Sequence, residues 1–385
     1  MNIKGTSKIR RVILSLTVAA TALACNFVMG GRDATPTEPP APPAALPTNT
    51  PLPVFTDTPA PTPTPEKPSL SNENFQTFAP KLTWDATSQI YGVSLSPDAK
   101  LVALLTQHGD SSSWLELWTS ETGEMIWRSD IGSMATYNAV NFSPDGSLIA
   151  TGTIDSKVRI WTTADGELVK TIEHHKWPVR VVAFSPDGTM IAAGASDSTA
   201  RVWNLSSGMS LGTYNLVTNA RDIAFSPNSR YLAVTANYVQ VYLVDAGNDD
   251  PTVYYDEESD TRDIGEVAFS PDGEILIGAG TWRDPTRNHR WTYGLLMWDF
   301  PSNRTQPASI KLKDAIEDAV ISPDGKVMVA VYKDKGILLL IDVKNRDVVN
   351  EINIGPKLFM SYSADIATFV VVSTKTTVTI WGVSR

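Results

Sequence analysis

The sequence predicts an all-β fold made of seven copies of one structural unit. From residue 71 onward, Ser-Pro-Asp or a close variant recurs seven times, with steps of 47, 42, 41, 44, 52 and 41 residues between the serines. Each copy follows one short apolar run and precedes another, which is typical of buried strands joined by a tight turn. The repeated serines are Ser96, Ser143, Ser185, Ser226, Ser270, Ser322 and Ser363.

Four strands are expected in each copy. The first ends at the tripeptide, where Pro sets φ and a glycine such as Gly146 supplies the left-handed position of the turn. The second, such as residues 190–195, is apolar nearly throughout, so we expect protein on both of its faces. The third ends at an aromatic residue in six of the seven copies, and a more polar fourth strand follows a polar turn such as residues 121–124.

Two copies identify the family that the repeats resemble. The segments IATGTIDSKVRIWTTADGELVKTIEHH and IAAGASDSTARVWNLSSG resemble WD repeats, and the resemblance covers about residues 71–385. It implies a seven-bladed β-propeller with four strands in each blade around a central channel. Dividing this region by seven gives about 45 residues for each blade, which is the size expected of the family.

The last blade lacks an outer strand in the order of the sequence. Its third-strand residue, Trp381, lies only four residues from the end of the printed sequence. We therefore expect residues 75–84 to supply this strand and to close the ring from the amino-terminal side. Such closure removes two open sheet edges at once.

The resemblance also implies a buried tetrad of Asp, His, hydroxyl and Trp side chains in each blade. Blade two lacks the histidine, and blade three has alanines at the expected hydroxyl positions, so no blade is complete. We assign the remaining members to the architecture rather than to catalysis. They are Thr151, Asp155 and Trp161 in blade two, and His175, Asp197 and Trp203 in blade three.

The amino terminus has the pattern of an export signal. Four cations within residues 1–11 precede an apolar run of thirteen residues, 12–24, which is shorter than the roughly 20 residues of a spanning helix. The run ends in Thr-Ala-Leu-Ala-Cys, residues 21–25, which resembles a bacterial lipobox and implies a signal peptide over residues 1–24 and a diacylglyceryl anchor on Cys25. Alternatively, residues 12–31 remain as a signal anchor. Both interpretations tether the chain outside the cytoplasm, at the cell membrane or cell surface.

Residues 25–70 are expected to be a disordered linker that begins at the lipid-anchored cysteine. Thirteen of the 26 prolines lie in residues 36–68, interleaved with Thr and Ala. At about 3.1 Å per residue, such a polyproline stalk reaches roughly 100 Å. It would carry the propeller, residues 71–385, away from a membrane surface.

Composition argues against several classes of function. The net charge is -10, and it becomes -14 without residues 1–24, which carry four cations and no acid, so we expect no nucleic-acid partner. The single cysteine permits no internal disulfide and no multi-cysteine metal site. We find no nucleophile elbow, zinc-protease helix, phosphate loop or paired carboxylates, and therefore expect no catalytic residue, metal or cofactor.

Loop lengths indicate where a partner would bind. The distance from the repeated serine to the third-strand tryptophan is 18 residues in blades two and three, but 22 in blade one and 28 in blade five. Both insertions should lie on the face where the first strands begin, which we call the top face, on opposite sides of the channel mouth. Exposed Trp and Arg side chains there would form binding hot spots. These candidates are Trp114, Trp177, Trp282, Arg283, Arg287, His289, Arg290 and Trp291.

The predicted function is that of a monomeric, non-enzymatic scaffold that binds a protein partner through this face. Three alternatives remain open at this point. The tryptophans could pack onto their own blades while the acidic run at residues 256–260 neutralises the basic loop. The face could instead bind a glycan, or the channel mouth could hold the site of a hydrolase or a quinoprotein-like enzyme.

Overall fold

The computed structural model describes the chain from residue 70 onward. The described ranges are 70–71, 73–109, 113–244, 252–254, 261–284, 290–302, 307–333 and 335–383. The predicted signal peptide, Cys25 and nearly all of the predicted linker lie outside these ranges. These ranges include the 3-10 turn η1 (Phe75–Thr77), and within them no helix is long and apolar enough to cross a membrane.

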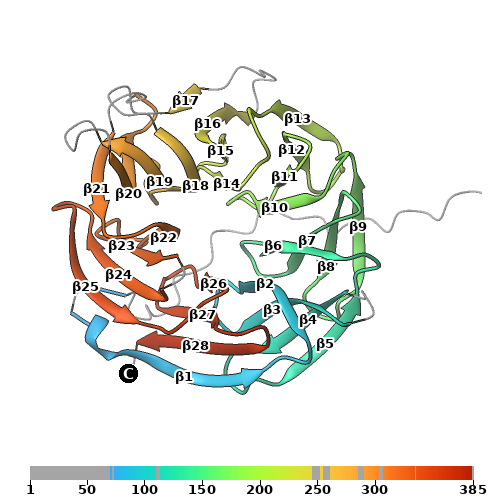
Figure 1. Ribbon diagram of the computed structural model, residues 1–385. Helices are drawn as coiled ribbons and strands as arrows, with labels where there is room; N and C mark the ends of the chain where they lie inside the picture. Colours follow the sequence, from blue (N-terminus) through green and yellow to red (C-terminus); the bar gives the residue numbers. More distant parts are fainter. Residues whose placement is uncertain are drawn as a thin grey trace, which may run out of the picture. The chain divides into compact units, whose positions relative to one another are not determined.

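Seven four-stranded antiparallel sheets are arranged as blades around a central channel (Figure 1). The predicted all-β, seven-bladed propeller is confirmed. In blades one to six the strands follow one another from the channel to the rim in chain order. Each blade therefore corresponds to one sequence repeat.

The strand bounds follow the repeats. Blade one contains β2 (Gln89–Leu95), β3 (Leu101–Gln107), β4 (Ser113–Thr119) and β5 (Met125–Asp130). Blade two contains β6 (Ala135–Phe142), β7 (Leu148–Thr153), β8 (Lys157–Thr162) and β9 (Leu168–Glu173). Blade three contains β10 (Val179–Phe184), β11 (Met190–Ala195), β12 (Thr199–Asn204) and β13 (Ser210–Asn215). Blade four contains β14 (Asp222–Phe225), β15 (Tyr231–Ala236), β16 (Tyr238–Leu243) and β17 (Thr252–Tyr254).

The remaining blades include the longest strands. Blade five contains β18 (Thr261–Phe269), β19 (Ile275–Asp284), β20 (Arg290–Asp299) and β21 (Ala308–Leu312). Blade six contains β22 (Ile316–Ile321), β23 (Val327–Tyr332), β24 (Ile337–Asp342) and β25 (Asp347–Asn353). Blade seven contains β26 (Phe359–Tyr362), β27 (Thr368–Val372), β28 (Thr377–Val383) and, at its outer edge, β1 (Phe78–Asp85).

Ring closure by the amino-terminal segment is confirmed. Strand β1 pairs antiparallel with β28, from Phe78 opposite Val383 to Asp85 opposite Thr377. The Phe78 ring stacks on Trp381 at 5.8 Å and meets Phe369 edge-on at 5.4 Å. This strand therefore both completes the last sheet and contributes to its core.

The repeated tripeptide forms the same hydrogen-bonded turn in every blade. In blade one, the Ser96 hydroxyl donates to the Asp98 carboxylate at 2.8 Å and accepts the backbone N–H of Leu101 at 2.9 Å. All seven repeated serines are buried. A buried hydroxyl that loses its partners costs about 1–3 kcal/mol, which explains why this residue type recurs.

The hydrophobic core consists of seven clusters, and each cluster lies between two neighbouring blades. The cluster between blades six and seven also buries Leu70 and Phe75 from the segment before β1. Because each blade packs only on its neighbours, an unclosed ring would expose two of these apolar faces.

Candidate functional site

The top face carries exposed apolar side chains on three consecutive blades. Trp177, in the loop between β9 and β10, is 62% exposed. Met134 and Ile154 are exposed on two loops of blade two, and the backbone N–H of Ile154 donates to the Met134 carbonyl at 3.1 Å. Val217 is exposed on the loop that leads into blade four. We call Met134, Ile154, Trp177 and Val217 the apolar arc.

The predicted exposure of Trp282 is wrong. This side chain is only 2% exposed and belongs to the cluster between blades four and five. The insertion in blade five lengthens the β19–β20 hairpin to ten residues in each strand rather than forming a free loop. Because side chains alternate along a strand, Trp282 points into the core while Arg283 points out.

The outward side of this hairpin keeps part of the predicted site. Trp291 is 50% exposed, and the guanidinium carbon of Arg283 lies 5.1 Å from the centre of its ring. Tyr293, two residues further along β20, is also exposed. Arg287 and His289 lie outside the described residues, and Arg290 is described only as the first residue of β20.

Trp114 packs on its own blade instead of projecting from it. The side chain is half-buried, and the Arg128 guanidinium carbon lies 4.9 Å from the centre of its ring. His108 contacts the same ring edge-on at 6.5 Å. In blade one the alternative of a self-packed tryptophan therefore describes the geometry better than an exposed hot spot.

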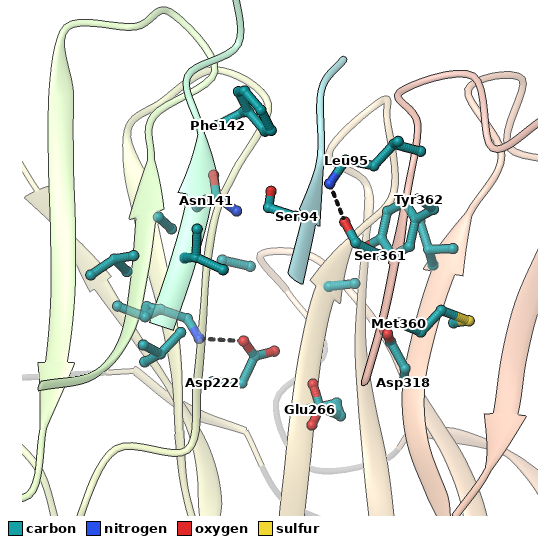
Figure 2. A pocket seen from close by; sticks show the side chains of 18 of the residues that line it. Ser94, Leu95, Asn141, Phe142, Asp222, Glu266, Asp318, Met360, Ser361 and Tyr362 are labelled. Atoms are coloured by element: carbon teal, nitrogen blue, oxygen red, sulfur yellow. Dashed lines mark hydrogen bonds between the residues drawn. The ribbon is translucent and has the colours of Figure 1, made fainter. Parts of the chain in front are cut away.

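The central channel holds a cavity of about 450 Å³, lined by the innermost strand of every blade (Figure 2). Asp222, Glu266 and Asp318 lie at one end of it. Each stands four residues before the repeated serine, in blades four, five and six respectively. No carboxylate pair was expected from the sequence, and the signal that points to this group is the shared position of the three acids relative to the repeated serine.

These carboxyl groups hold protons more tightly than isolated ones. Burial, together with the charge of Asp318, raises the pKa of Asp222 to about 6, although two backbone N–H groups donate to Asp222 and oppose the shift. Burial and the charges of Asp222 and Asp318 raise the pKa of Glu266 well above its ordinary value. Burial also raises the pKa of Asp318, against the opposing charge of Lys357.

One bond of this group joins two blades. The Asp222 carboxylate accepts the backbone N–H of Val267, in blade five, at 2.9 Å. Within the described ranges, no group of three or more His, Cys, Asp or Glu side chains is arranged to hold a metal ion. The contact that the structure shows for this group is therefore the one that Asp222 makes between blades four and five.

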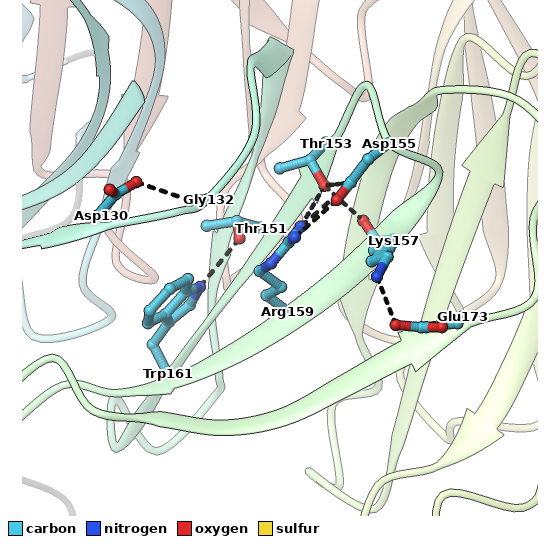
Figure 3. Close-up of polar contacts among 9 residues, drawn as sticks. All are labelled: Asp130, Gly132, Thr151, Thr153, Asp155, Lys157, Arg159, Trp161 and Glu173. Carbon is cyan, nitrogen blue, oxygen red and sulfur yellow. Dashed lines mark hydrogen bonds and ion pairs between the residues drawn. The ribbon is translucent and has the colours of Figure 1, made fainter. Parts of the chain in front are cut away.

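In blade two the tetrad members separate into two pairs (Figure 3). The Trp161 indole N–H donates to Thr151 Oγ1 at 3.0 Å. Asp155 instead forms an ion pair with Arg159, whose Nη2 lies 2.6 Å from Oδ2, and also accepts a bond from Thr153. Asp155, which the resemblance would pair with a histidine, thus pairs with Arg159 on the third strand of the same blade.

In blade three the Asp and His remain together. His175 Nδ1 lies 3.2 Å from Asp197 Oδ2, and Thr199 Oγ1 donates to Asp197 Oδ1 at 2.6 Å. Burial lowers the pKa of His175, against the charge of Asp197. The hydroxyl beside Asp197 thus comes from Thr199 at the start of the third strand, and Trp203 packs edge-on against His175 at 5.7 Å.

Blade one contains a buried acid that the sequence analysis missed. Glu116 is fully buried and accepts the Trp118 indole N–H at 3.0 Å and the Thr106 hydroxyl at 3.0 Å. The Thr87 hydroxyl also donates to it. The available signal was its position, because Glu116 stands two residues before the third-strand tryptophan, where Arg159 and Arg201 stand in blades two and three.

Comparison with known proteins agrees with this architecture. The family described as "WD domain, G-beta repeat" matches residues 130–162 and 166–204, in blades two and three. The chain is 37% identical over 180 residues to bovine pre-mRNA-processing factor 19, which covers 41% of the chain and 35% of the relative. It is 24% identical over 236 residues to an Arabidopsis thaliana WD repeat-containing protein WDS homolog, covering 60% of the chain and 35% of the relative.

A third relative matches a shorter segment. The periodic tryptophan protein 2 homolog of Dictyostelium discoideum is 34% identical over 104 residues, which covers 25% of the chain and 11% of that protein. The chain thus spans about a third or less of the length of these relatives. The repeats, the blade geometry and these matches together define a β-propeller. The chain is a seven-bladed β-propeller, and its blades two and three match the WD-repeat family.

Proposed function

We propose that this protein is a non-enzymatic scaffold that binds a partner protein through the apolar arc of its top face. The observation that carries the proposal is the exposure of Trp177 on the same face as the exposed apolar residues of blades two and four. Exposed tryptophan is enriched at the centres of protein interfaces, and clustered apolar surface on a soluble domain commonly marks an interaction site. The WD-repeat relatives support the same class of function.

Photo-crosslinking tests this proposal directly. A benzophenone amino acid is placed at position 177 of the full-length chain, in the organism that produces it, and a matched chain carries it at Leu168. Leu168 is also an exposed apolar residue, but it lies on the outer strand β9. We expect a discrete protein adduct from position 177 and none from position 168. Equal labelling at both positions, or no protein adduct at 177, would contradict top-face binding.

The same proposal includes a tether outside the cytoplasm, anchored at Cys25. Its support is the cationic, apolar and lipobox-like order of residues 1–25, followed by the proline-rich segment. Cys25→Ser should move the chain from the detergent phase to the aqueous phase in a partition assay. If the variant stays in the detergent phase, the uncleaved signal anchor over residues 12–31 replaces the lipid.

A glycan is the second candidate ligand, at a different place. Trp291 and Tyr293 point to the same side of the β19–β20 hairpin, next to Arg283, and two exposed aromatic rings on one strand face suit a flat ligand such as a sugar. A glycan array probed with the wild-type chain and with Trp291→Ala tests this possibility. Binding that survives the substitution would exclude the hairpin as the site.

A further inference from the structure

We propose that the top face of blade three binds an acidic segment of the partner, with Arg180 and Lys176 taking its carboxylate beside Trp177. The inference rests on the proposed function and adds the chemistry of the partner. It starts from a comparison of equivalent positions in neighbouring blades.

Two neighbouring blade pairs are joined by an ion pair at the top end of their first strands. In each pair, one partner stands five positions before the repeated serine of its blade, and the other stands near the start of the first strand of the next blade. Arg221 of blade four pairs in this way with Asp263 of blade five. Glu317 of blade six lies 3.4 Å from Lys357 of blade seven. These contacts define where an inter-blade ion pair can form.

Arg180 occupies the same position in blade three, but blade four has no counter-charge for it. Asn219 stands where blade five has Asp263, and Ala220 stands where blade seven has Lys357. Arg180 is exposed and forms no ion pair with any residue that the structure describes. The cation is therefore present where the chain's own carboxylate is missing.

A second cation, Lys176, stands four residues before Arg180 in the sequence. Lys176 is exposed, and its side chain has no ion pair within the described ranges. The two nearby acids are already engaged, since Asp197 holds His175 and Thr199 while Asp155 holds Arg159. Asp130, the exposed acid at the end of β5, accepts the backbone N–H of Gly132.

This arrangement selects a particular partner. A guanidinium with no partner of its own can donate charge-assisted hydrogen bonds to a carboxylate, and an adjacent exposed indole shields that contact from water. The chain as a whole carries a net charge of -10, so the two cations Lys176 and Arg180 are a local exception to its negative charge. Such local complementarity orients an acidic segment during association. We infer a segment with Asp or Glu next to a bulky apolar residue.

The test uses a phage-displayed library of random twelve-residue peptides, selected on the immobilised full-length chain. We expect the selected peptides to be enriched in Asp or Glu adjacent to Trp, Phe or Leu. One such peptide, labelled with a fluorophore, is then titrated against variants by anisotropy. Arg180→Gln should weaken binding about tenfold or more, as expected for losing a hydrogen bond to a charged group.

A second variant separates this role from general damage. Asn219→Asp gives blade four the carboxylate that blade five has at Asp263, so that Arg180 gains an internal partner. We expect this change to weaken the acidic peptide as well, while the melting temperature stays the same or rises. Arg346→Gln, an exposed arginine in the turn between β24 and β25, serves as the control that should not change affinity.

The outcomes distinguish this inference from the proposed function. Selected peptides that lack acids and bind Arg180→Gln normally, but lose affinity for Trp177→Ala, would overturn the inference and leave top-face protein binding intact. Peptides insensitive to both substitutions would overturn both. Arg180-dependent binding of a poly(dT) oligonucleotide or of phosphatidylglycerol vesicles, without any acidic peptide, would replace the protein segment with another anion and contradict the inference.

Discussion

Glu266→Gln is expected to stabilise the propeller at neutral pH and to weaken the dependence of its stability on pH. Glu266 lies beside Asp222 and donates a hydrogen bond to it when protonated. Glutamine keeps the shape and a donor but carries no charge. The substitution therefore removes an ionisable group from among three neighbouring carboxyl groups without opening a cavity.

The sign follows from proton binding. The pKa values of Glu266 and Asp222 are raised in the folded chain, so the folded state holds protons that the unfolded state has already released. These two groups do not affect stability at low pH. They destabilise the fold increasingly as the pH rises from their ordinary pKa values to their raised pKa values in the folded chain. For Asp222, this window runs from the ordinary value of 3.8 to about 6.

The size of the change in the free energy of unfolding can be taken from the pKa shift of Asp222. The difference between 3.8 and about 6 for Asp222 corresponds to on the order of 3 kcal/mol, and water in the channel reduces this figure. For a domain of this size, 1–3 kcal/mol corresponds to roughly 2–6 °C in melting temperature. We expect Glu266→Gln to recover a similar amount at pH 7 and almost nothing at pH 4.

Thermal unfolding of full-length wild type and variant between pH 4 and pH 8, followed by circular dichroism, measures the effect. The variant is compared with wild type at each pH, because other carboxylates titrate over the same range. Glu274→Gln, at an exposed glutamate in the turn between β18 and β19, is the matched control and should follow wild type. A variant that melts lower at pH 7, or parallels wild type throughout, would refute the account of the channel.

Two further predictions concern stability. Deleting residues 71–84 should lower the melting temperature and cause aggregation, because it exposes the edge of β28 and the core face under Phe78. Deleting residues 26–68 should change neither property. Equal stability of the two truncations would exclude closure by β1. Glu116→Ala should lower the free energy of unfolding, measured by denaturant titration, by at least about 1–3 kcal/mol. The reason is that the Trp118 and Thr106 donors stay buried without their acceptor. An unchanged free energy of unfolding would mean that water replaces the carboxylate.

The strands and their closure could be predicted because they depend on spacing along the chain. Buried Ser226 and its equivalents set the repeat, and the position of Trp381 implied an outer strand from elsewhere. The direction of Trp282 could not be predicted in the same way. It depends on whether the inserted residues continue a strand, and only the β19–β20 register settles that.

The channel carboxyl groups show a second reason for failure. Asp222, Glu266 and Asp318 are about 45 residues apart in sequence, and no local pattern connects them. They meet because equivalent positions of neighbouring blades converge on one axis. Glu116 was missed for a related reason, since its three donors come from the segment before β2 and from strands β3 and β4.

The most direct test of the apolar arc as a protein-binding surface is the affinity of Trp177→Ala for a peptide or partner that wild type binds. Melting curves are recorded on the same samples, and Leu168→Ala is the control. The account predicts that Trp177→Ala binds roughly thirtyfold more weakly, the effect of losing about 2 kcal/mol at a hot spot, with an unchanged melting temperature. Unchanged affinity together with a lowered melting temperature would show that Trp177 serves the fold, and would contradict the central claim.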